Sequence, residues 1–355
     1  MSGKTLLATL SVALLLILPF AGAQDMGLNR YLSEEQYRHM ELMGYTTAEQ
    51  FQALAEIAPD ALCEELDIDY YELENILEAM PYTRDFEPVY EEDQPLGLLL
   101  EDEPRIVSYE ELLEEQPDYV DMSSTDLIPN CPPIRNQGQR GTCASFSGTV
   151  FLEYEYMNYE GYNDLDLSEQ YFFYACKQRD GSPYSDGTTM TAVRDTVKYD
   201  GTCYEDTWPY NPNPTNDPAQ GPAPAGAAQE AKSFVYPNVK YWSSNPGIST
   251  LKSYIDDGHI ISFGTVVYNS WYKSSATKKT GVITMPISGD SVAGGHAMDL
   301  VGYVDNTSYA GGGYFLLRNS WGTGWAYQSI TGNPGYGVIP YAYITNYWQG
   351  GFTAA

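Results

Sequence analysis

The sequence is poor in basic residues and contains only three histidines. Lysine and arginine total 18 against 48 aspartates and glutamates, so the 355-residue chain carries a formal net charge of −30 at pH 7. Nucleic acids and anionic membrane surfaces both require clustered basic residues, and we expect neither as a partner. Because 43% of the residues are hydrophobic and 14% aromatic, the chain can bury one or two cores, which argues against a disordered or fibrous protein.

Beyond its first 23 residues, the sequence has no apolar run that is long enough to span a bilayer. Lys4 precedes the apolar run 6–20, and the small residues 21–23 provide a site for signal peptidase. The run is shorter than the roughly 20 apolar residues that a membrane anchor needs. We therefore expect residues 1–23 to be a signal peptide and the protein to be secreted into an oxidising compartment, where disulfides survive.

Acidic residues are concentrated in the first part of the chain. Residues 24–115 contain 26 acidic and four basic residues, whereas residues 116–355 contain 22 acidic and 13 basic residues. This change in composition divides the chain into two chemically different parts, with a boundary near residue 115.

Helix signals occur within residues 24–85. Thr47 with Gln50, and Asp69 with Glu72, have capping-box spacing, and an apolar stripe at helical spacing follows each pair. We expect two or three short helices in a segment that is similar to a helix-hairpin-helix unit. Its surface would be strongly negative, so the similarity predicts a shape and not DNA binding.

Residues 86–115 predict a linker between the two parts. They mix prolines and acidic residues with a short apolar cluster, Leu96 and 98–100, and show no helical period. Two roles remain open for this linker. It is either a solvated spacer or a segment that lies along a cleft in the second part.

The second part contains candidates for covalent catalysis. Cys143 follows a glycine-containing turn and begins a stretch with helical spacing, so its sulfur would lie at a helix N-terminus, where unpaired N–H groups favour the thiolate. We expect His39 at the surface and His259 at a strand edge. His296 follows two glycines that leave its ring open to approach, which suits a general base. Asn319, in a polar turn after an apolar strand, can accept a hydrogen bond from an imidazole and fix its tautomer.

Five short motifs give the second part a family resemblance. They are Asn136-Gln137-Gly138, Gly141-Thr142-Cys143 with Phe146-Ser147, Leu167-Ser168-Glu169-Gln170, Gly295-His296-Ala297, and Asn319-Ser320-Trp321-Gly322. Their order is that of the papain-like (cathepsin-type) cysteine peptidases, which the chain resembles from about residue 118 to 345. The resemblance implies an α+β fold with a mostly helical lobe, a twisted β-barrel lobe and an active-site groove between them.

The resemblance also implies a role for each candidate residue. Cys143 is then the nucleophile, His296 the general base and acid, and Asn319 the residue that orients the histidine. Gln137 donates, with the backbone N–H of Cys143, to the oxyanion of the tetrahedral intermediate, and water hydrolyses the resulting acyl-enzyme thioester. Trp321 covers the hydrogen bond between histidine and asparagine.

Near the nucleophile, the chain departs from the family pattern at two positions. The residue after Cys143 is usually tryptophan and here is Ala144. Arg140 replaces a cysteine, so the disulfide that braces this turn in papain is absent, and its guanidinium would favour the thiolate if it faced the sulfur. Farther along the chain, Gly187 resembles the position where the family's backbone pairs with an extended peptide substrate.

The chain has five cysteines, an odd number, so at least one is expected to be unpaired or paired between chains. We expect a disulfide between Cys176 and Cys203, which would stabilise the fold by roughly 3–4 kcal/mol. For Cys63 and Cys131, a link between the two parts and a reduced state both remain open. We expect no metal and no cofactor, because the cysteines are too scattered for zinc and the acidic runs lack the spacing of a calcium loop.

Taken together, these features predict a secreted, monomeric cysteine endopeptidase made as a proenzyme, with peptides or proteins as substrates. Residues 24–115 would block the groove, although they lack the long helices of the usual cathepsin proregion, so this role follows from their position alone. Residues 116–355 would form the peptidase domain. Two alternatives stay open: an inactive papain-fold binding module, and a peptide ligase or transamidase that uses the same acyl-enzyme.

Overall fold

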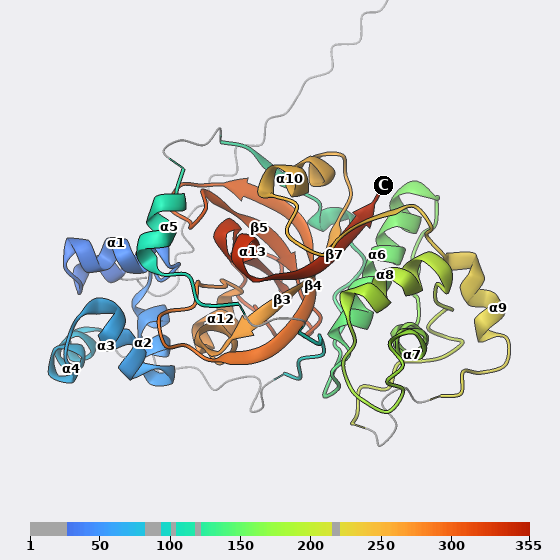
Figure 1. Cartoon of the computed structure of the whole chain (residues 1–355), viewed down its shortest axis with the longest axis horizontal. Helices are drawn as coiled ribbons and strands as arrows, with labels where there is room; N and C mark the ends of the chain where they lie inside the picture. The colour runs from blue at the N-terminus through green and yellow to red at the C-terminus, as the bar shows by residue number, and fades with distance from the viewer. Residues whose placement is uncertain (1–26, 82–93, 101–103, 118–121, 215–220) are drawn as a thin grey trace, which may run out of the picture.

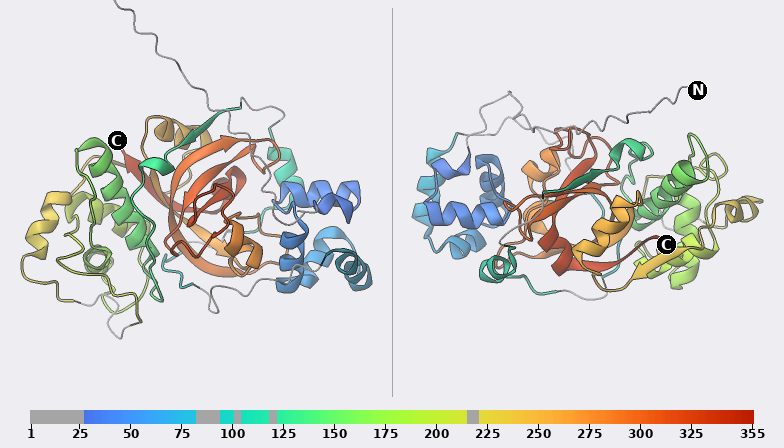
Figure 2. Two further views of the ribbon diagram at one scale, coloured as in Figure 1. Left: turned by 180° about the vertical axis from the view of Figure 1, so that it is seen from behind. Right: turned by 90° about the horizontal axis from the view of Figure 1, so that it is seen from above.

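The computed structural model describes residues 27–81, 94–100, 104–117, 122–214 and 221–355. The expected signal peptide lies outside these residues. The described chain forms three parts in a row: a cluster of short helices, a curved sheet and a helical lobe (Figures 1 and 2). No described helix combines the length and the apolar character needed to cross a membrane.

The central part is a strongly curved antiparallel sheet, here called the β lobe. Its strands are β1 (Ser124–Asp126), β2 (Val239–Trp242), β3 (Ile261–Tyr268), β4 (Val292–Asp305), β5 (Gly313–Arg318), β6 (Tyr336–Pro340) and β7 (Trp348–Ala354). They pair in the order β2-β7-β3-β4-β5-β6, and β1 pairs with β4. Helix α13 (Tyr341–Tyr347) packs against β3, β5, β6 and β7, so the apolar core lies inside the curve (Figure 1).

The helical lobe is built around one central helix. It contains α6 (Cys143–Tyr159), α7 (Glu169–Asp180), α8 (Met190–Tyr199) and α9 (Ala227–Ala231). Helix α6 contacts α7 and α8 on one side and β3 and β4 on the other. Helix α6 is buried from its first residue, Cys143, onwards, and this residue lies at the junction of the two lobes.

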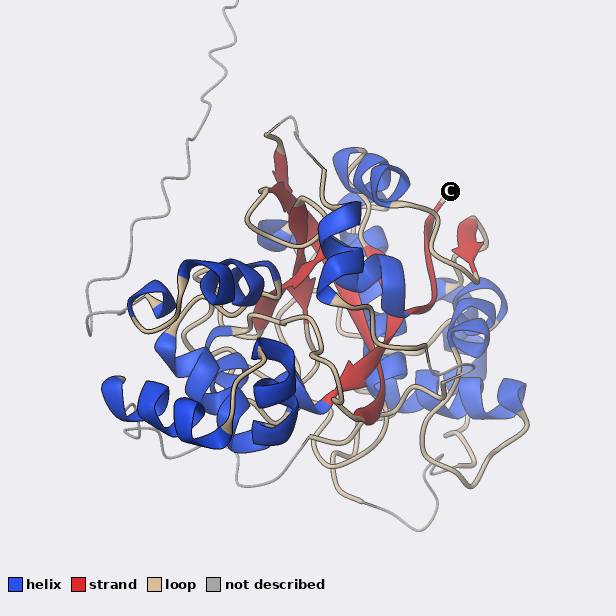
Figure 3. Cartoon of the chain, turned by 60° about the vertical axis from the view of Figure 1, so that its left-hand side comes forward, coloured by secondary structure: helices blue, strands red, loops and turns tan. Residues whose placement is uncertain are grey.

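Shorter elements complete the described chain. They are η1 (Leu28–Arg30), η2 (Ile128–Asn130), η3 (Lys232–Phe234), α10 (Ile248–Asp256), α11 (Asn269–Tyr272) and α12 (Ser275–Thr280). Figure 3 shows the helices flanking the strands.

Residues 27–81, the described portion of the segment 24–85, form four α-helices, where two or three were expected. They are α1 (Glu34–Leu42), α2 (Ala48–Ile57), α3 (Pro59–Leu66) and α4 (Tyr70–Ala79). The two predicted capping boxes are confirmed, since Thr47 caps α2 and Asp69 caps α4. Ser33 forms a further capping box at α1, and Pro59 occupies the first turn of α3, where its missing N–H costs nothing.

These helices dock on the β lobe mainly through apolar and neutral contacts. Helix α2 packs against α11 and α12. Tyr45 is 2% exposed, and its hydroxyl accepts a hydrogen bond of 3.0 Å from Thr284 Oγ1. An ion pair of 2.8 Å joins Lys279 Nζ to Glu49 Oε2. Local contacts therefore outweigh the repulsion between two acidic parts.

The interval predicted to be a linker without helical period contains a helix, so that prediction was wrong in part. Helix α5 (Tyr109–Glu115) begins with a capping box between Ser108 and Glu111, a signal that the sequence carries. Its residue Leu112 is 1% exposed and anchors the helix.

Helix α5 also corrects the expectation that His39 is a surface residue. The His39 ring stacks on Tyr109, with ring centres 3.8 Å apart, and its Nε2 lies 2.6 Å from Glu65 Oε1. Glu65 Oε2 in turn accepts from the backbone N–H of Ser288 in the β lobe. His39 is covered because α5, which the sequence interpretation lacked, packs over it.

The predicted disulfide between Cys176 and Cys203 is wrong, since both thiols are free, as are those of Cys63 and Cys131. On α7, Ala175 packs in the cluster that contains Cys203, whereas the next residue, Cys176, faces α8, where its Sγ lies 3.4 Å from Thr196 Oγ1. Successive helical residues point about 100° apart, and this rotation separates the two sulfurs.

Candidate active site

Cys143 is the first residue of α6 and is fully buried at the junction of the lobes. The backbone N–H of Ala297, on β4, donates to its Sγ at 3.4 Å. The sulfur therefore contacts the residue that follows His296, and the two candidate catalytic residues come together from different lobes. His259 lies elsewhere, with its Nδ1 3.0 Å from Glu155 Oε2.

The imidazole of His296 is held by Asn319. Its Nε2 lies 2.8 Å from Asn319 Oδ1, which also accepts from the backbone N–H of Ser320 at 2.7 Å. Trp321 is 2% exposed and stacks on the imidazole, with ring centres 4.5 Å apart. Among the described residues, His296 Nδ1 has no hydrogen-bond partner, which leaves this nitrogen available for proton transfer.

Gln137 is held with its amide nitrogen facing two carbonyl groups. Its Oε1 accepts from Ser320 Oγ at 2.7 Å, which fixes the orientation of the amide. Its Nε2 donates to Arg140 O and to Pro95 O, both at 2.8 Å. Ser320 thus supports both Gln137 and Asn319, a role that the sequence interpretation missed although the residue lies inside one of the five motifs.

Residues 94–100, here called the groove segment, run between the two lobes. Leu98 N donates to Gly295 O of β4 at 3.1 Å, and Leu99 N donates to Thr188 O of the helical lobe at 2.9 Å. On the helical side, the backbone pairing falls on Thr188, one residue beyond Gly187. Gly187 N instead donates to Gly141 O, while the carbonyl of Gly187 accepts from the buried Lys177 Nζ at 2.7 Å.

The groove segment lies directly over the nucleophile. The Gly97 N–H lies near the Cys143 sulfur and acts to lower the pKa of its thiol. A Cβ on Gly97 would come within 2.2 Å of the Gly141 backbone, so only glycine allows the chain to pass this closely. Leu98 is 5% exposed and covers Gly264, whose own Cβ would lie 2.4 Å from Leu98 Cδ2.

Under this cover, both candidate catalytic groups are favoured in their neutral forms. Burial raises the pKa of Cys143 to about 11, although backbone N–H groups, first that of Ala297, oppose the shift. Burial likewise lowers the pKa of His296 to about 4, opposed by the hydrogen bond with Asn319. Exposure of the site to water would relieve both shifts and favour the thiolate and the imidazolium.

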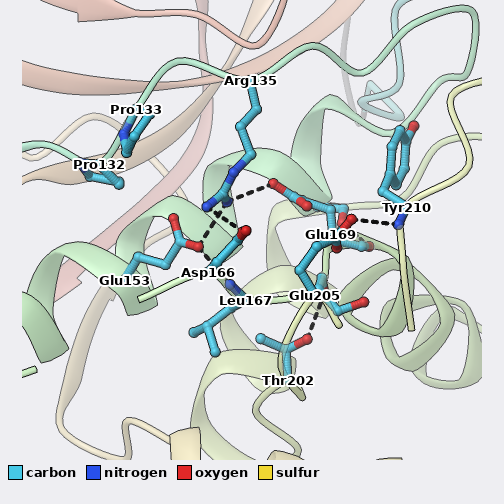
Figure 4. Close-up of polar contacts among 12 residues, drawn as sticks. Pro132, Pro133, Arg135, Glu153, Asp166, Leu167, Glu169, Thr202, Glu205 and Tyr210 are labelled. Atoms are coloured by element: carbon cyan, nitrogen blue, oxygen red, sulfur yellow. Dashed lines mark hydrogen bonds and ion pairs between the residues drawn. The ribbon is translucent and has the colours of Figure 1, made fainter. Parts of the chain in front are cut away.

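The helical lobe contains a second group of charged side chains, here called the Arg135 cluster, in which Glu153 and Glu169 are buried (Figure 4). Arg135 Nη1 lies 2.7 Å from Glu153 Oε1 and 3.0 Å from Glu169 Oε1, and its Nη2 lies 2.7 Å from Asp166 Oδ1. Burial raises the pKa of Glu153, with the guanidinium opposing it and Glu169 adding to it. Burial also raises the pKa of the nearby Glu205 to about 7.

We expect the Arg135 cluster to make the protein more stable as the pH falls from about 7 to about 4.5. A glutamate in the unfolded chain ionises near 4.5, whereas Glu153 and Glu205 ionise at higher pH in the folded chain. Unfolding therefore releases protons in this window, and the free energy of unfolding rises as the pH falls. Midpoints of thermal unfolding, measured at several pH values, should show a weaker pH dependence for Glu153→Gln than for the wild type.

The control for this experiment is Glu34→Gln. Glu34 is exposed and pairs with Arg38 on the surface of α1, far from the cluster, so its replacement should leave the slope of the wild type unchanged. Equal slopes for Glu153→Gln and the wild type would contradict the prediction.

Within the described part of the chain, no group of histidine, cysteine, aspartate or glutamate is arranged to hold a metal ion.

Comparisons with known proteins agree with this geometry. A sequence model of the family described as papain family cysteine protease matches residues 116–336. An uncharacterized peptidase C1-like protein of Acanthamoeba polyphaga mimivirus is 26% identical over 230 residues, which cover 64% of this chain and 70% of the relative. Papain from Carica papaya is 27% identical over 227 residues, which cover 62% of this chain and 56% of that protein.

Solved structures show the same fold. Xylellain, a cysteine protease from Xylella fastidiosa, superposes with a TM-score of 0.58 at 22% sequence identity, covering 75% of this chain and 98% of that chain. The predicted papain-like α+β fold is confirmed, and its expected twisted β-barrel lobe is the curved antiparallel sheet described above.

Proposed function

The chain belongs to the papain family of cysteine proteases, and we propose that it is an exported endopeptidase made as a proenzyme. The observation that carries the proposal is the meeting of Cys143, at the start of α6, with the β4 residue that follows His296, whose Nε2 is held by Asn319. This arrangement suits acyl transfer to sulfur. Export follows from the expected signal peptide.

In this mechanism, His296 Nδ1 takes the proton of the Cys143 thiol, and the thiolate attacks the peptide carbonyl. The S–C bond forms as the carbonyl electron pair moves to oxygen, where Gln137 Nε2 and the Cys143 N–H donate to the oxyanion. The imidazolium then protonates the leaving amine, and the C–N bond breaks to give a thioester. Water, deprotonated by His296, then attacks the thioester carbonyl. The C–S bond breaks as the acid leaves, and the Cys143 thiolate is restored beside the protonated His296. Asn319 keeps the imidazole in the required tautomer throughout.

We infer that the groove segment keeps the full-length chain inactive. In the mechanism above, Gln137 Nε2 must donate to the substrate oxyanion, and in the full-length chain this donor is engaged by Pro95 O. The Gly97 N–H also lies near the sulfur, and burial beneath the groove segment favours the neutral thiol. Substrate and groove segment would therefore compete for the same donors.

The proposed function is tested by identifying both the reactive residue and the products. After the groove segment has been displaced, iodoacetamide should label Cys143 and abolish hydrolysis, with the labelled residue identified by mass spectrometry. A mixed peptide library whose product N-termini are sequenced should reveal cleavage at internal bonds. Release of terminal residues alone would indicate an exopeptidase, and products joined to an added amine would indicate a transamidase. Absence of any turnover together with an unreactive Cys143 would reject catalysis and favour a binding module.

A further inference from the structure

Arg140 occupies the position where the family usually has a cysteine, and its side chain enters the helical lobe. The residue is 1% exposed. Its Nη1 donates to Gln170 Oε1 on α7 at 2.8 Å and to the backbone carbonyl of Asn211 at 2.9 Å. The guanidinium carbon lies 5.3 Å from the ring centres of both Phe173 and Tyr210. Burying a guanidinium is costly unless its donors and its charge are satisfied, and here amide, carbonyl and aromatic groups surround it.

The backbone of the same residue contacts the oxyanion donor. Gln137 Nε2 donates to the carbonyl oxygen of Arg140 at 2.8 Å, so the position of this carbonyl affects where the amide points. Gly138, with φ of +61°, and Gly141 lie on either side of Arg140. Glycines leave a backbone free to move, and a loop that contains two of them needs an external anchor to hold one conformation.

Tyr210 adds a second attachment between this loop and the helical lobe. Its hydroxyl donates to the Gln137 carbonyl at 2.8 Å and lies 2.5 Å from Thr142 Oγ1. The Tyr210 ring is one of the two that face the guanidinium. The side chain of Arg140 and the hydroxyl of Tyr210 thus tie residues 137–142 to the lobe at several points.

We propose that Arg140 is a positioning residue that fixes the loop 137–142, and through it the Gln137 amide, for oxyanion binding. The guanidinium pins residue 140 to α7 and to residue 211, and the carbonyl of the same residue directs Gln137 Nε2. The buried guanidinium thereby holds this turn through hydrogen bonds and ring contacts, whereas a disulfide holds it in papain. This inference rests on the proposed function, because it concerns the oxyanion of that reaction.

The test compares two reactions of Cys143 that differ in their need for Gln137. In the first reaction, the Cys143 thiolate attacks the carbonyl carbon of a peptide aldehyde. The former carbonyl oxygen then lies at the oxyanion position, where it takes up a proton to give a hemithioacetal. Iodoacetamide instead loses iodide as sulfur attacks its methylene carbon, without forming an oxyanion. The parent protein carries Leu98→Asp, which puts a carboxylate into the buried contact of the groove segment with Gly264 and is expected to open the site. In this parent, Arg140→Met should raise the aldehyde inhibition constant and lower kcat, each by about 10- to 30-fold, less than the roughly 100-fold or greater loss of a whole oxyanion donor. Alkylation by iodoacetamide should change by less than about threefold.

Several variants keep the test decisive. Arg179→Met is the matched control, because Arg179 also lies 5.3 Å from a tyrosine ring, that of Tyr199, and should affect neither reaction. If Arg140→Met does not fold, Arg140→Lys and Gln170→Ala should show the same selective loss at smaller size. In a Gln137→Ala background, Arg140→Met should add almost nothing, because both act on one donor.

The outcomes separate this inference from the proposed function. Equal losses in both reactions, or no loss in either, overturn the role of Arg140. Additive losses in the double variant overturn it as well. If the parent is alkylated at Cys143, so that its site is open, but hydrolyses no peptide, the proposed function fails, and this result is read from the parent alone. If Cys143 of the parent is not alkylated, the same comparison of variants is made after the groove segment has been displaced.

Discussion

Once the groove segment has been displaced, replacing Cys143 with alanine should lower peptide hydrolysis by about 100,000-fold while the protein keeps its fold. The proposed mechanism forms its only covalent bond to substrate at this sulfur, and enzymes of this kind lose nearly all catalysis without their nucleophile. Loss of one buried sulfur atom removes little packing, so the thermal midpoint should move by only a few degrees. Hydrolysis of a fluorogenic peptide and a thermal unfolding curve measure the two effects.

Cys176→Ala provides the matched control for this prediction. Cys176 is another fully buried free thiol, and its Sγ contacts Thr196 on α8 rather than the candidate site. Its replacement should leave hydrolysis within about threefold of the wild type, because no step of the mechanism uses it. If, with the groove segment displaced in both proteins, Cys143→Ala hydrolysed the peptide as fast as the wild type, the nucleophile would lie elsewhere and the mechanism would be rejected.

The residues of the candidate site were predictable because each lies in a short motif whose chemistry is local. A cysteine at a helix start, a histidine after two glycines and an asparagine after an apolar strand carry their signals in neighbouring residues. The structure brings Cys143 next to the strand of His296, and His296 against Asn319. Capping boxes gave the starts of α2 and α4 for the same reason, since each is a pattern within four residues.

Features that depend on distant contacts could not be predicted in this way. The direction of the Arg140 side chain depends on α7 and on residue 211, which are far away in sequence. The separation of Cys176 from Cys203 depends on which face of α7 meets α8. The pairing of the groove segment with Thr188 depends on contacts between residues about 90 positions apart, which no local pattern fixes. Helix α5 differs from these, because its capping box was present in the sequence and was overlooked.

Both parts of the chain are acidic, yet the groove segment can stay in place between the lobes. The contacts that hold it explain why. Its hydrogen bonds to Gly295 and Thr188 are formed by backbone groups, which carry no net charge. Its side chains are mainly apolar, and Leu98 is buried. Repulsion between acidic surfaces therefore acts at longer range, where salt screens it, whereas the closing contacts act at short range. A substitution that puts charge into the short-range contacts should open the site.

Leu98→Asp should accordingly raise the hydrolytic activity of the full-length chain by about 100-fold. An aspartate at this position would have to bury its carboxylate against Gly264 and Met190, and a cost of about 3 kcal/mol corresponds to roughly that change in the closed population. The exposed site would also lose the burial that raises the pKa of Cys143 to about 11, so the thiol should react with iodoacetamide at lower pH. Both rates are measured on intact protein, with its length checked by mass spectrometry.

Leu99→Asp distinguishes this mechanism from a general effect of added charge. Leu99 is the next residue of the same segment and is 43% exposed, so an aspartate there stays hydrated and the segment should remain closed. Gly97→Ala should open the site without any charge, because its Cβ would collide with the Gly141 backbone. If Leu98→Asp and Gly97→Ala were as inactive as the wild type while Cys143 in all three reacted equally with iodoacetamide, residues 94–100 would not be the inhibitor. If Leu99→Asp activated the chain as strongly as Leu98→Asp, net charge rather than the buried leucine would control the opening.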